Sequence, residues 1–113
     1  MLYISNTFSA DLFTNVLPRK GMVDAFIKRY NADEAWRRVS LLDRDEIVSL
    51  VNDADLASVL TTLLGRTIEV NKDRTSLKMG DELIWVQYNG PKLLEGATML
   101  PKGSEIVFLG IRL

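Results

Sequence analysis

The spacing of apolar residues changes partway along this chain, and that change constrains its fold more than any other feature. Between residues 54 and 64, apolar side chains recur at the i, i+3, i+4, i+7 and i+8 positions of one helix face: Leu56, Val59, Leu60, Leu63 and Leu64. Asp53 or Asp55 can cap the first turn, and Gly65 stands where a helix-terminating glycine belongs. The spacing therefore predicts a helix over Ala54–Leu64.

After this helix the apolar residues alternate with a period of two, which is typical of strands, and a similar short strand opens the chain. The predicted strands are Leu2–Ser5, Thr67–Val70, Thr75–Met79, Glu82–Tyr88 and Glu105–Leu113. The third and fourth are expected to form a hairpin about Gly80-Asp81, and in the fourth Leu83, Trp85 and Gln87 share one face. The last strand is apolar on both faces over 106–109, which predicts a central position in the sheet.

The segment between residues 10 and 52 gives weaker signals. A short helix over 10–17 ends before Pro18, because the residue preceding a proline disfavours the helical conformation. Asp43 and Glu46 match a capping box for another short helix over 47–51. The remaining predictions here are a turn at 19–21, helical spacing over 22–30, a loop at 31–34 and a strand over 36–41.

This order of elements predicts an α/β fold, with one small domain over residues 1–113 and a mixed β-sheet flanked by helices. Hydrophobic residues make up 47% of the chain and charged residues 26%, as in ordinary globular proteins. A chain of 113 residues buries only a small core. A homodimer that buries further surface is therefore expected.

Composition argues against several classes of function. A net charge of −1 argues against a protein that coats long nucleic acid. The chain has no cysteine and no histidine, so we expect no disulfide, no metal site and no cofactor. No apolar run approaches the ~20 residues of a membrane span, and no signal peptide opens the chain, so a cytoplasmic location is expected.

Small polar side chains follow the first strand, and each has an ordinary explanation beside a functional one. Asn6 and Ser9 can satisfy backbone groups in a turn or cap, or they can contact a phosphate or ribose. Arg74 can be a solvated surface residue or a ligand contact. Gln87 lies in an otherwise apolar strand, so if it is buried it must bond to a neighbouring loop or to a base edge.

Charged residues elsewhere carry the same two interpretations. Lys92 and Glu95 can form a surface ion pair in an ordinary loop. Asp53 and Asp55 are good helix caps, whereas a metal or acid–base role would need a further ligand or a perturbing partner. The Trp36–Arg38 segment can stack on bases, although a core tryptophan beside exposed arginines is the commoner arrangement.

A series of motifs in a fixed order extends over most of the chain: Tyr3–Ser9, Asn71–Arg74, Gly80–Leu83, Gln87 and Lys92–Gly96. In this order the chain resembles the viral anti-CRISPR ring nuclease family, whose members bind and cleave cyclic tetra-adenylate. Relatives of that family also occur in bacterial genomes and prophages. The resemblance is best over residues 1–11 and 54–113 and poor over 12–52.

The resemblance implies a homodimer that holds one cyclic tetra-adenylate in a groove between its subunits. It implies ligand-binding positions at Asn6, Ser9, Asp11, Arg74, Gln87 and Lys92. It implies catalytic positions at Ser9, Asp53, Lys92 and Glu95. In the family no metal takes part: the ribose 2′-hydroxyl attacks the adjacent phosphate and leaves a 2′,3′-cyclic phosphate.

The chain departs from the family pattern at two catalytic positions. The family's Gly-His pair aligns with Asn52-Asp53, and its arginine before Leu-x-Glu-Gly is Lys92. An ionised aspartate cannot protonate the departing 5′ oxygen, and losing a general acid typically slows a reaction by ~10²–10⁴-fold. We expect the ligand to be bound and cleaved slowly or not at all, which would still lower the free messenger of a type III CRISPR response.

Two other interpretations remain open at this stage. The fold can serve as a non-enzymatic protein-interaction module with a repurposed groove, since residues 12–52 are unlike the family. Alternatively, the chain can be a ring nuclease for a different cyclic nucleotide.

Overall fold

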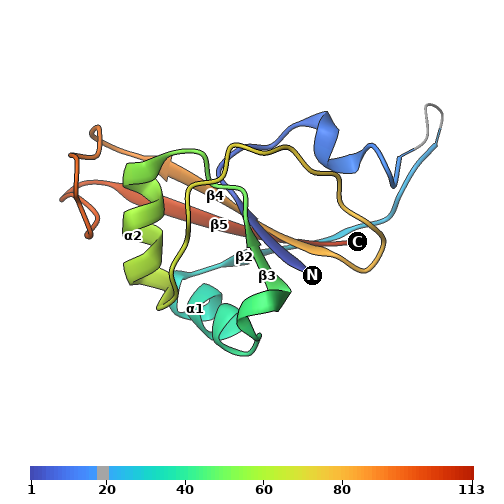
Figure 1. Ribbon diagram of the computed structural model, residues 1–113, viewed down its shortest axis with the longest axis horizontal. Helices are drawn as coiled ribbons and strands as arrows, with labels where there is room; N and C mark the ends of the chain where they lie inside the picture. Colours follow the sequence, from blue (N-terminus) through green and yellow to red (C-terminus); the bar gives the residue numbers. More distant parts are fainter. Residues whose placement is uncertain (18–20) are drawn as a thin grey trace.

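The computed structural model describes residues 1–17 and 21–113, which form a five-stranded sheet and two helices (Figure 1). In chain order the elements are β1 (Leu2–Ser5), β2 (Phe26–Tyr30), α1 (Ala32–Ser40), β3 (Ile47–Ser49), α2 (Ala54–Leu64), β4 (Glu82–Asn89) and β5 (Glu105–Arg112). Short 3-10 helices form at Ala10–Phe13 and Arg44–Glu46. The predicted α/β class, with a mixed sheet and flanking helices, is confirmed.

The sheet has the strand order β2-β5-β4-β1-β3. β1 runs parallel to both of its neighbours, β3 and β4, whereas β5 runs antiparallel to β4 and β2. β5 therefore has a strand on each side, as its apolar run predicts. Because β1, β3 and β4 are parallel, their carboxyl ends point the same way, and residues that follow them can meet in one place.

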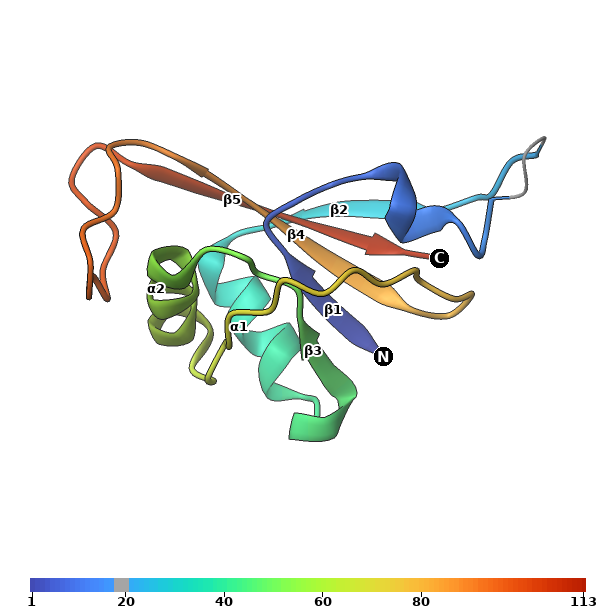
Figure 2. The same ribbon diagram turned by 45° about the horizontal axis from the view of Figure 1, so that its top comes forward.

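Both helices cover the same face of the sheet (Figure 2). Buried sheet residues on this face are Leu2, Ile4, Ile84, Val86 and Phe108. The helices pack against them with Ala35 and Val39 from α1 and with Leu56, Val59, Leu60 and Leu64 from α2. Among the described residues no helix is long and apolar enough to cross a membrane.

An ion pair at the start of β4 ties α1 to the sheet. Arg38 donates from Nε to Glu82 Oε2 at 3.0 Å and from Nη2 to the other carboxylate oxygen. Arg112 of β5 adds a hydrogen bond of 3.3 Å to Glu82 Oε1. Burial raises the pKa of Glu82, but the hydrogen bonds and charges of the two arginines together outweigh it and hold that pKa below its ordinary value. Glu82 is therefore ionised and paired in the folded protein.

The opposite face of the sheet carries a smaller core. Its buried members are Leu12, Leu50, Leu77, Leu83 and Ile111. The backbone amide of Leu77 donates to the carbonyl of Leu12 at 2.7 Å, so two irregular segments cover this face together. Phe8 lies 5.0 Å from the ring of Trp85 and is 50% exposed. This face is thus covered less completely than the one beneath the helices.

Where the local signals were strong, the predictions are confirmed. β1 and α2 have the predicted bounds, Asp53 caps α2, and Gly65 ends it with a positive φ of 69°. β4 and β5 form, although β5 ends one residue earlier than predicted. As the period of two requires, Leu83 and Trp85 contribute to the smaller core, on the face away from the helices.

The predictions for residues 22–41 are wrong. The helical spacing over 22–30 gives way to β2, which pairs with the distant β5. The predicted loop at 31–34 and strand over 36–41 are instead α1, which begins with a capping box between Asn31 and Glu34. Ala35 and Val39, one helical turn apart, are its buried residues, whereas Trp36 is 47% exposed. Because Trp36 was treated as a core residue, residues 36–41 were assigned the period of a strand when they have that of a helix.

Three further predictions need correction. The capping box of Asp43 and Glu46 is present, but it closes a 3-10 turn that leads into β3, because residues 47–49 pair with β1. Residues 67–70 and 75–79 are not strands, so β4 lacks its predicted hairpin partner. The helix over 10–17 shortens to the 3-10 helix Ala10–Phe13. Of the turn at 19–21, residues 19 and 20 lie outside the described residues.

Candidate functional site

Two asparagine side chains meet beyond the ends of β1 and β3. Asn6 Nδ2 donates to Asn52 Oδ1 at 2.9 Å, and the Asn52 backbone amide donates to Asn6 Oδ1 at 3.1 Å. The two residues are 46 positions apart, and Asn52 directly precedes the cap of α2. This reciprocal pair fixes the chain after β1 against the start of α2. One cleft opens beside Asn52 and another beside Asn6.

The first cleft has a volume of about 350 Å³, and we call it the Arg74 cleft. Its polar lining includes Ser9, Asp11, Asn71, Lys72 and Arg74. Asn71 holds the far wall in place, since its Nδ2 donates to the Ser49 carbonyl at 2.8 Å and its Oδ1 accepts from the Asp73 amide at 2.9 Å. Two cations, Lys72 and Arg74, and two carboxylates, Asp11 and Asp73, thus line a cleft that is open to solvent.

Arg74 makes an exposed ion pair in this cleft. Its Nη1 lies 3.1 Å from Asp11 Oδ2, with the two side chains 88% and 58% exposed. Such a pair is strongly screened by water and contributes little to stability. An incoming phosphate can therefore replace Asp11 as the partner of the guanidinium at small cost. In this structure the ion pair with Asp11 holds the Arg74 guanidinium beside the cleft.

The second cleft has a volume of about 610 Å³, and we call it the Lys92 cleft. Its lining includes Asn6, Asp53, Trp85, Gln87 and Lys92. Gln87 is exposed, so it does not need the internal partner that a buried amide would require. Gln87 and Trp85 line the same cleft, and the Gln87 amide can bond to a group that enters it. The cleft therefore combines an aromatic surface and amides with one cation, Lys92, and two carboxylates, Asp53 and Asp55.

Asp53 has a structural task as well as a place in this cleft. Its Oδ1 accepts from the backbone amides of Asp55 at 2.9 Å and Leu56 at 3.2 Å, as an N-cap does. A carboxylate in this role is an acceptor and is poorly suited to donate a proton to a leaving group.

The two clefts suit binding better than acid catalysis. The residues that the structure describes contain no group of three acidic, histidine or cysteine side chains placed to hold a metal ion. Protonated groups at the clefts come from Lys72 and Arg74 on one side and Lys92 on the other. These cations can bond to phosphates, and the amides of Asn6 and Gln87 can pair with the edges of bases. The same clefts also carry four carboxylates, those of Asp11, Asp53, Asp55 and Asp73.

The sequence profile of the STIV B116-like family matches residues 2–108. The chain belongs to the STIV B116-like family. Ten chains of solved structures are similar to it. One of them, B116 of Sulfolobus turreted icosahedral virus, superposes with a TM-score of 0.77 at 17% identity, and the match covers 99% of this chain and 98% of B116. No curated protein sequence is matched.

Membership of the STIV B116-like family agrees with the expected likeness to a viral protein family. At 17% identity, the match to B116 shows the common fold and nothing finer. In this B116-like chain the Arg74 cleft gathers Ser9, Asp11 and Arg74. The Lys92 cleft gathers Asn6, Asp53, Gln87 and Lys92. Glu95, in the exposed loop after β4, lines neither cleft.

Sequence reasoning missed several residues of this site. Asn52 had no role beyond its alignment, yet it is the partner of Asn6. Asn71 and Lys72 belonged to a recognised motif but not to the predicted ligand set, although both line the Arg74 cleft. Trp85 was predicted only as one residue of a strand face. The repeated Asn after strand ends, at positions 6 and 52, is the signal that could have joined the first pair.

Proposed function

We propose that this B116-like chain binds a cyclic oligoadenylate, most readily cyclic tetra-adenylate, in a groove shared by two copies. By holding or slowly cleaving the ring it would lower the free messenger of a type III CRISPR response. The observation that carries this proposal is the Asn6–Asn52 pair, which stands between two clefts that contain most of the predicted ligand residues. The proposed setting is the cytoplasm of an infected or lysogenic host cell.

The chemistry of both clefts supports a ligand made of phosphates and adenines. Arg74 lines one cleft and Lys92 the other. Each cation could therefore bond to a different phosphate of the same ring. Asn and Gln amides can donate to and accept from the edge of an adenine, and Trp85 offers a face on which a base can stack. The chain as a whole is slightly acidic, so these local cations would select a compact anion rather than a long polymer.

A dimer follows from the size and symmetry of the proposed ligand. A twofold dimer presents the same surface twice, and a ring with an even number of repeats can lie on that twofold axis. The surface around the clefts can accept a second copy, since Phe8 is half exposed at the less covered face of the sheet. Each copy would then supply one set of cations and amides.

Cleavage by this chain would lack a good proton donor. The ribose 2′-oxygen would attack the adjacent phosphorus, the bond from phosphorus to the 5′ oxygen would break, and the 5′ oxygen would take up a proton. Asp53 caps α2 as an acceptor, which leaves the Lys92 ammonium as the nearest cationic acid in the cleft. Lysine is a weak acid at neutral pH, so the proposal gives slow turnover or pure sequestration.

Titration calorimetry with cyclic tetra-adenylate tests this function. We expect heat at micromolar protein with one ring per two chains, and a dimer in analytical ultracentrifugation. Arg74→Gln should weaken binding about tenfold or more. Arg37→Gln, which removes the same charge from the exposed side of α1, should leave it unchanged. Absence of heat, or a monomer that stays monomeric with the ring present, would refute the proposal.

Two other functions are tested alongside. The aromatic cluster of Phe8, Phe13 and Trp85 favours a protein-interaction module, because it leaves apolar surface next to the Lys92 cleft. Amides in both clefts, together with Arg74 and Lys92, favour the ring instead. A cleavage panel across ring sizes and bases separates cyclic tetra-adenylate from another cyclic nucleotide.

A further inference from the structure

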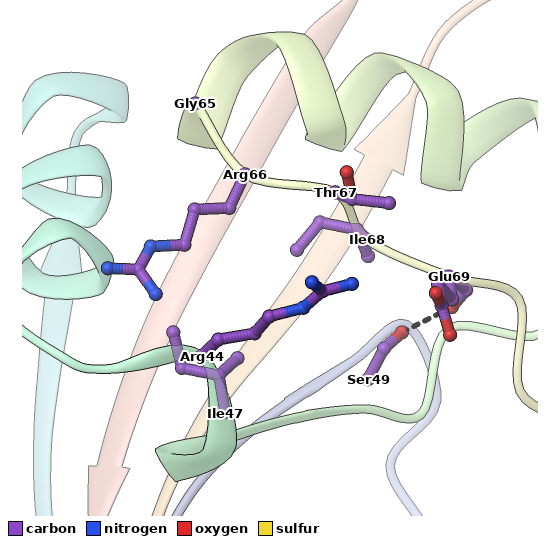
Figure 3. A pocket seen from close by; sticks show the side chains of 8 residues that line it. All are labelled: Arg44, Ile47, Ser49, Gly65, Arg66, Thr67, Ile68 and Glu69. Carbon is purple, nitrogen blue, oxygen red and sulfur yellow. Dashed lines mark hydrogen bonds between the residues drawn. The ribbon is translucent and has the colours of Figure 1, made fainter.

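A third cavity, of about 540 Å³, lies apart from both clefts between β3 and the segment that follows α2 (Figure 3). We call it the Arg44 pocket. Its lining includes Arg44, Ile47, Ser49, Arg66 and Ile68. None of the residues predicted for ring binding lines it, and its volume falls in the range of about 300–1,000 Å³ that is common for small-molecule sites.

The Arg44 pocket has an apolar middle crossed by a guanidinium. Arg44 extends into the cavity with Ile47 on one side and Ile68 on the other, as Figure 3 shows. Ile68 is buried, so it forms a fixed apolar wall. Arg66 runs along the rim toward the end of α1, where its Nη2 makes a long hydrogen bond of 3.5 Å to the Ser40 carbonyl. The two guanidiniums therefore point to different ends of the cavity, that of Arg44 across its middle and that of Arg66 toward α1 (Figure 3).

Neither of these arginines is neutralised by the protein around it. In the ranges 1–17 and 21–113, Arg44 and Arg66 take part in no salt bridge. The one carboxylate of the pocket belongs to Glu69, whose backbone carbonyl accepts from Ser49 Oγ at 2.6 Å. That bond joins the two walls and closes one end of the pocket. An anion that entered at the open end would find the Arg44 guanidinium without a carboxylate partner.

We propose that the Arg44 pocket is a second ligand site, which takes a small phosphate monoester with an apolar organic part. The phosphate would bond to the guanidinium of Arg44, whose planar fork matches its oxygens, and Arg66 at the rim would add to the positive potential. The organic part would lie against Ile47 and Ile68, and its binding would shield apolar surface of the pocket from water. Both halves of the ligand therefore follow from the lining of one cavity.

This site is separate from the proposed ring site. Ser49 lines the Arg44 pocket and Asn71 lines the Arg74 cleft, and the hydrogen bond between them forms part of the wall that divides the two. Phosphate ester binding should therefore survive Arg74→Gln. Failure at one site leaves the other standing, because the two are tested with different ligands and different variants.

An amide NMR titration with phenyl phosphate at low ionic strength tests the proposal. We expect shifts concentrated at residues 44–49 and 65–69, and saturation at sub-millimolar to millimolar ligand. Arg44→Gln should weaken binding by about tenfold or more, because it removes charge-assisted hydrogen bonds. Arg44→Lys should fall between, since lysine keeps the charge but loses the fork. Arg37→Gln, with the same loss of charge elsewhere, is the control and should bind as the original chain does.

Several outcomes would overturn the proposal. Shifts that map to the Arg74 cleft, or no shifts at all, would remove the site. If Arg37→Gln and Arg44→Gln weaken binding of phenyl phosphate equally, the binding depends on the overall charge of the protein and not on this pocket. If inorganic phosphate binds as tightly as phenyl phosphate, the pocket does not recognise an apolar organic part. Arg44 is exposed, so its variants are expected to fold, and the dispersion of the amide spectrum verifies this in the same experiment.

Discussion

Replacing Asp53 by histidine separates the cap of α2 from the chemistry of the Lys92 cleft. The Asp53 carboxylate accepts two backbone hydrogen bonds, of 2.9 and 3.2 Å, and histidine cannot reproduce them. Losing an N-cap of this kind costs about 0.5–2 kcal/mol. For a domain near this size, each kcal/mol lowers Tm by roughly 4–8 °C. Asp53→His should thus fold, but with a measurably lower Tm.

The same substitution would supply a general acid beside the proposed ring. Histidine has an ordinary pKa of ~6.5, so a useful share is protonated near neutral pH. A positioned acid contributes ~10²–10⁴-fold to rate, and an imperfectly placed one less. We expect single-turnover cleavage of cyclic tetra-adenylate to rise by about tenfold or more, and to decline as the pH rises past that pKa.

Asp53→Asn is the matched control for this experiment. Asparagine caps helices about as well as aspartate, but its amide is not acidic and cannot protonate a leaving group, so Tm should be kept and cleavage should stay slow. The reasoning is refuted if Asp53→His binds the ring and cleaves it no faster than Asp53→Asn. A variant that fails to bind the ring at all would instead show that the ligand is wrong.

Three further predictions concern stability and electrostatics. Glu82→Gln should lower stability by about 1–2 kcal/mol at neutral pH, because it removes the charge that Arg38 and Arg112 share. The pKa of Glu82 is depressed in the folded protein, so its stabilising contribution is present above the ordinary pKa of 4.5 and is lost as the pH falls through the lower folded pKa. Measured down to about pH 3, the Tm values of the original chain and of Glu82→Gln should therefore converge. Gly65→Ala should cost about 2 kcal/mol in chemical denaturation, because Gly65 has a φ of +69° and its new Cβ would lie 2.6 Å from Trp36 Nε1. Gly80→Ala should cost about 1 kcal/mol, because Gly80 also has a positive φ but has open space around the new Cβ. Equal losses of stability would contradict this assignment of the close contact. If phosphates meet Arg74, then Arg74→Gln should reduce the slope of log affinity against log salt by about one, and an unchanged slope would show that Arg74 contacts no phosphate.

The parts of the fold that sequence predicted well are those whose signals are local. α2 carries a full apolar stripe, a capping aspartate and a terminal glycine within a dozen residues, so nothing distant is needed to define it. β4 carries a local apolar run over 83–86 and faces a core on both sides. The candidate site was predicted in part for a similar reason, since short polar residues after a strand mark the edge where parallel strands end.

The parts that failed depend on contacts far away in the chain. Phe26 and Ile27 belong to β2 only because they pair with the last strand, and their side chains remain largely exposed. α1 was obscured by Trp36, an exposed aromatic that suggested a core position. In the site, Asn52 and Asn6 come from opposite sides of the poorly matched segment. No local pattern joins residues that meet only after the sheet has assembled.

The mutual hold of Asn6 and Asn52 has a consequence for recognition. An asparagine amide offers two donor hydrogens and two acceptor lone pairs, and Asn6 commits one of each to its partner. Its orientation is thus settled before any guest arrives, while half of its bonding capacity is still vacant. The conformational entropy of the Asn6 side chain is lost during folding, so a ligand that binds there would not have to order it on binding.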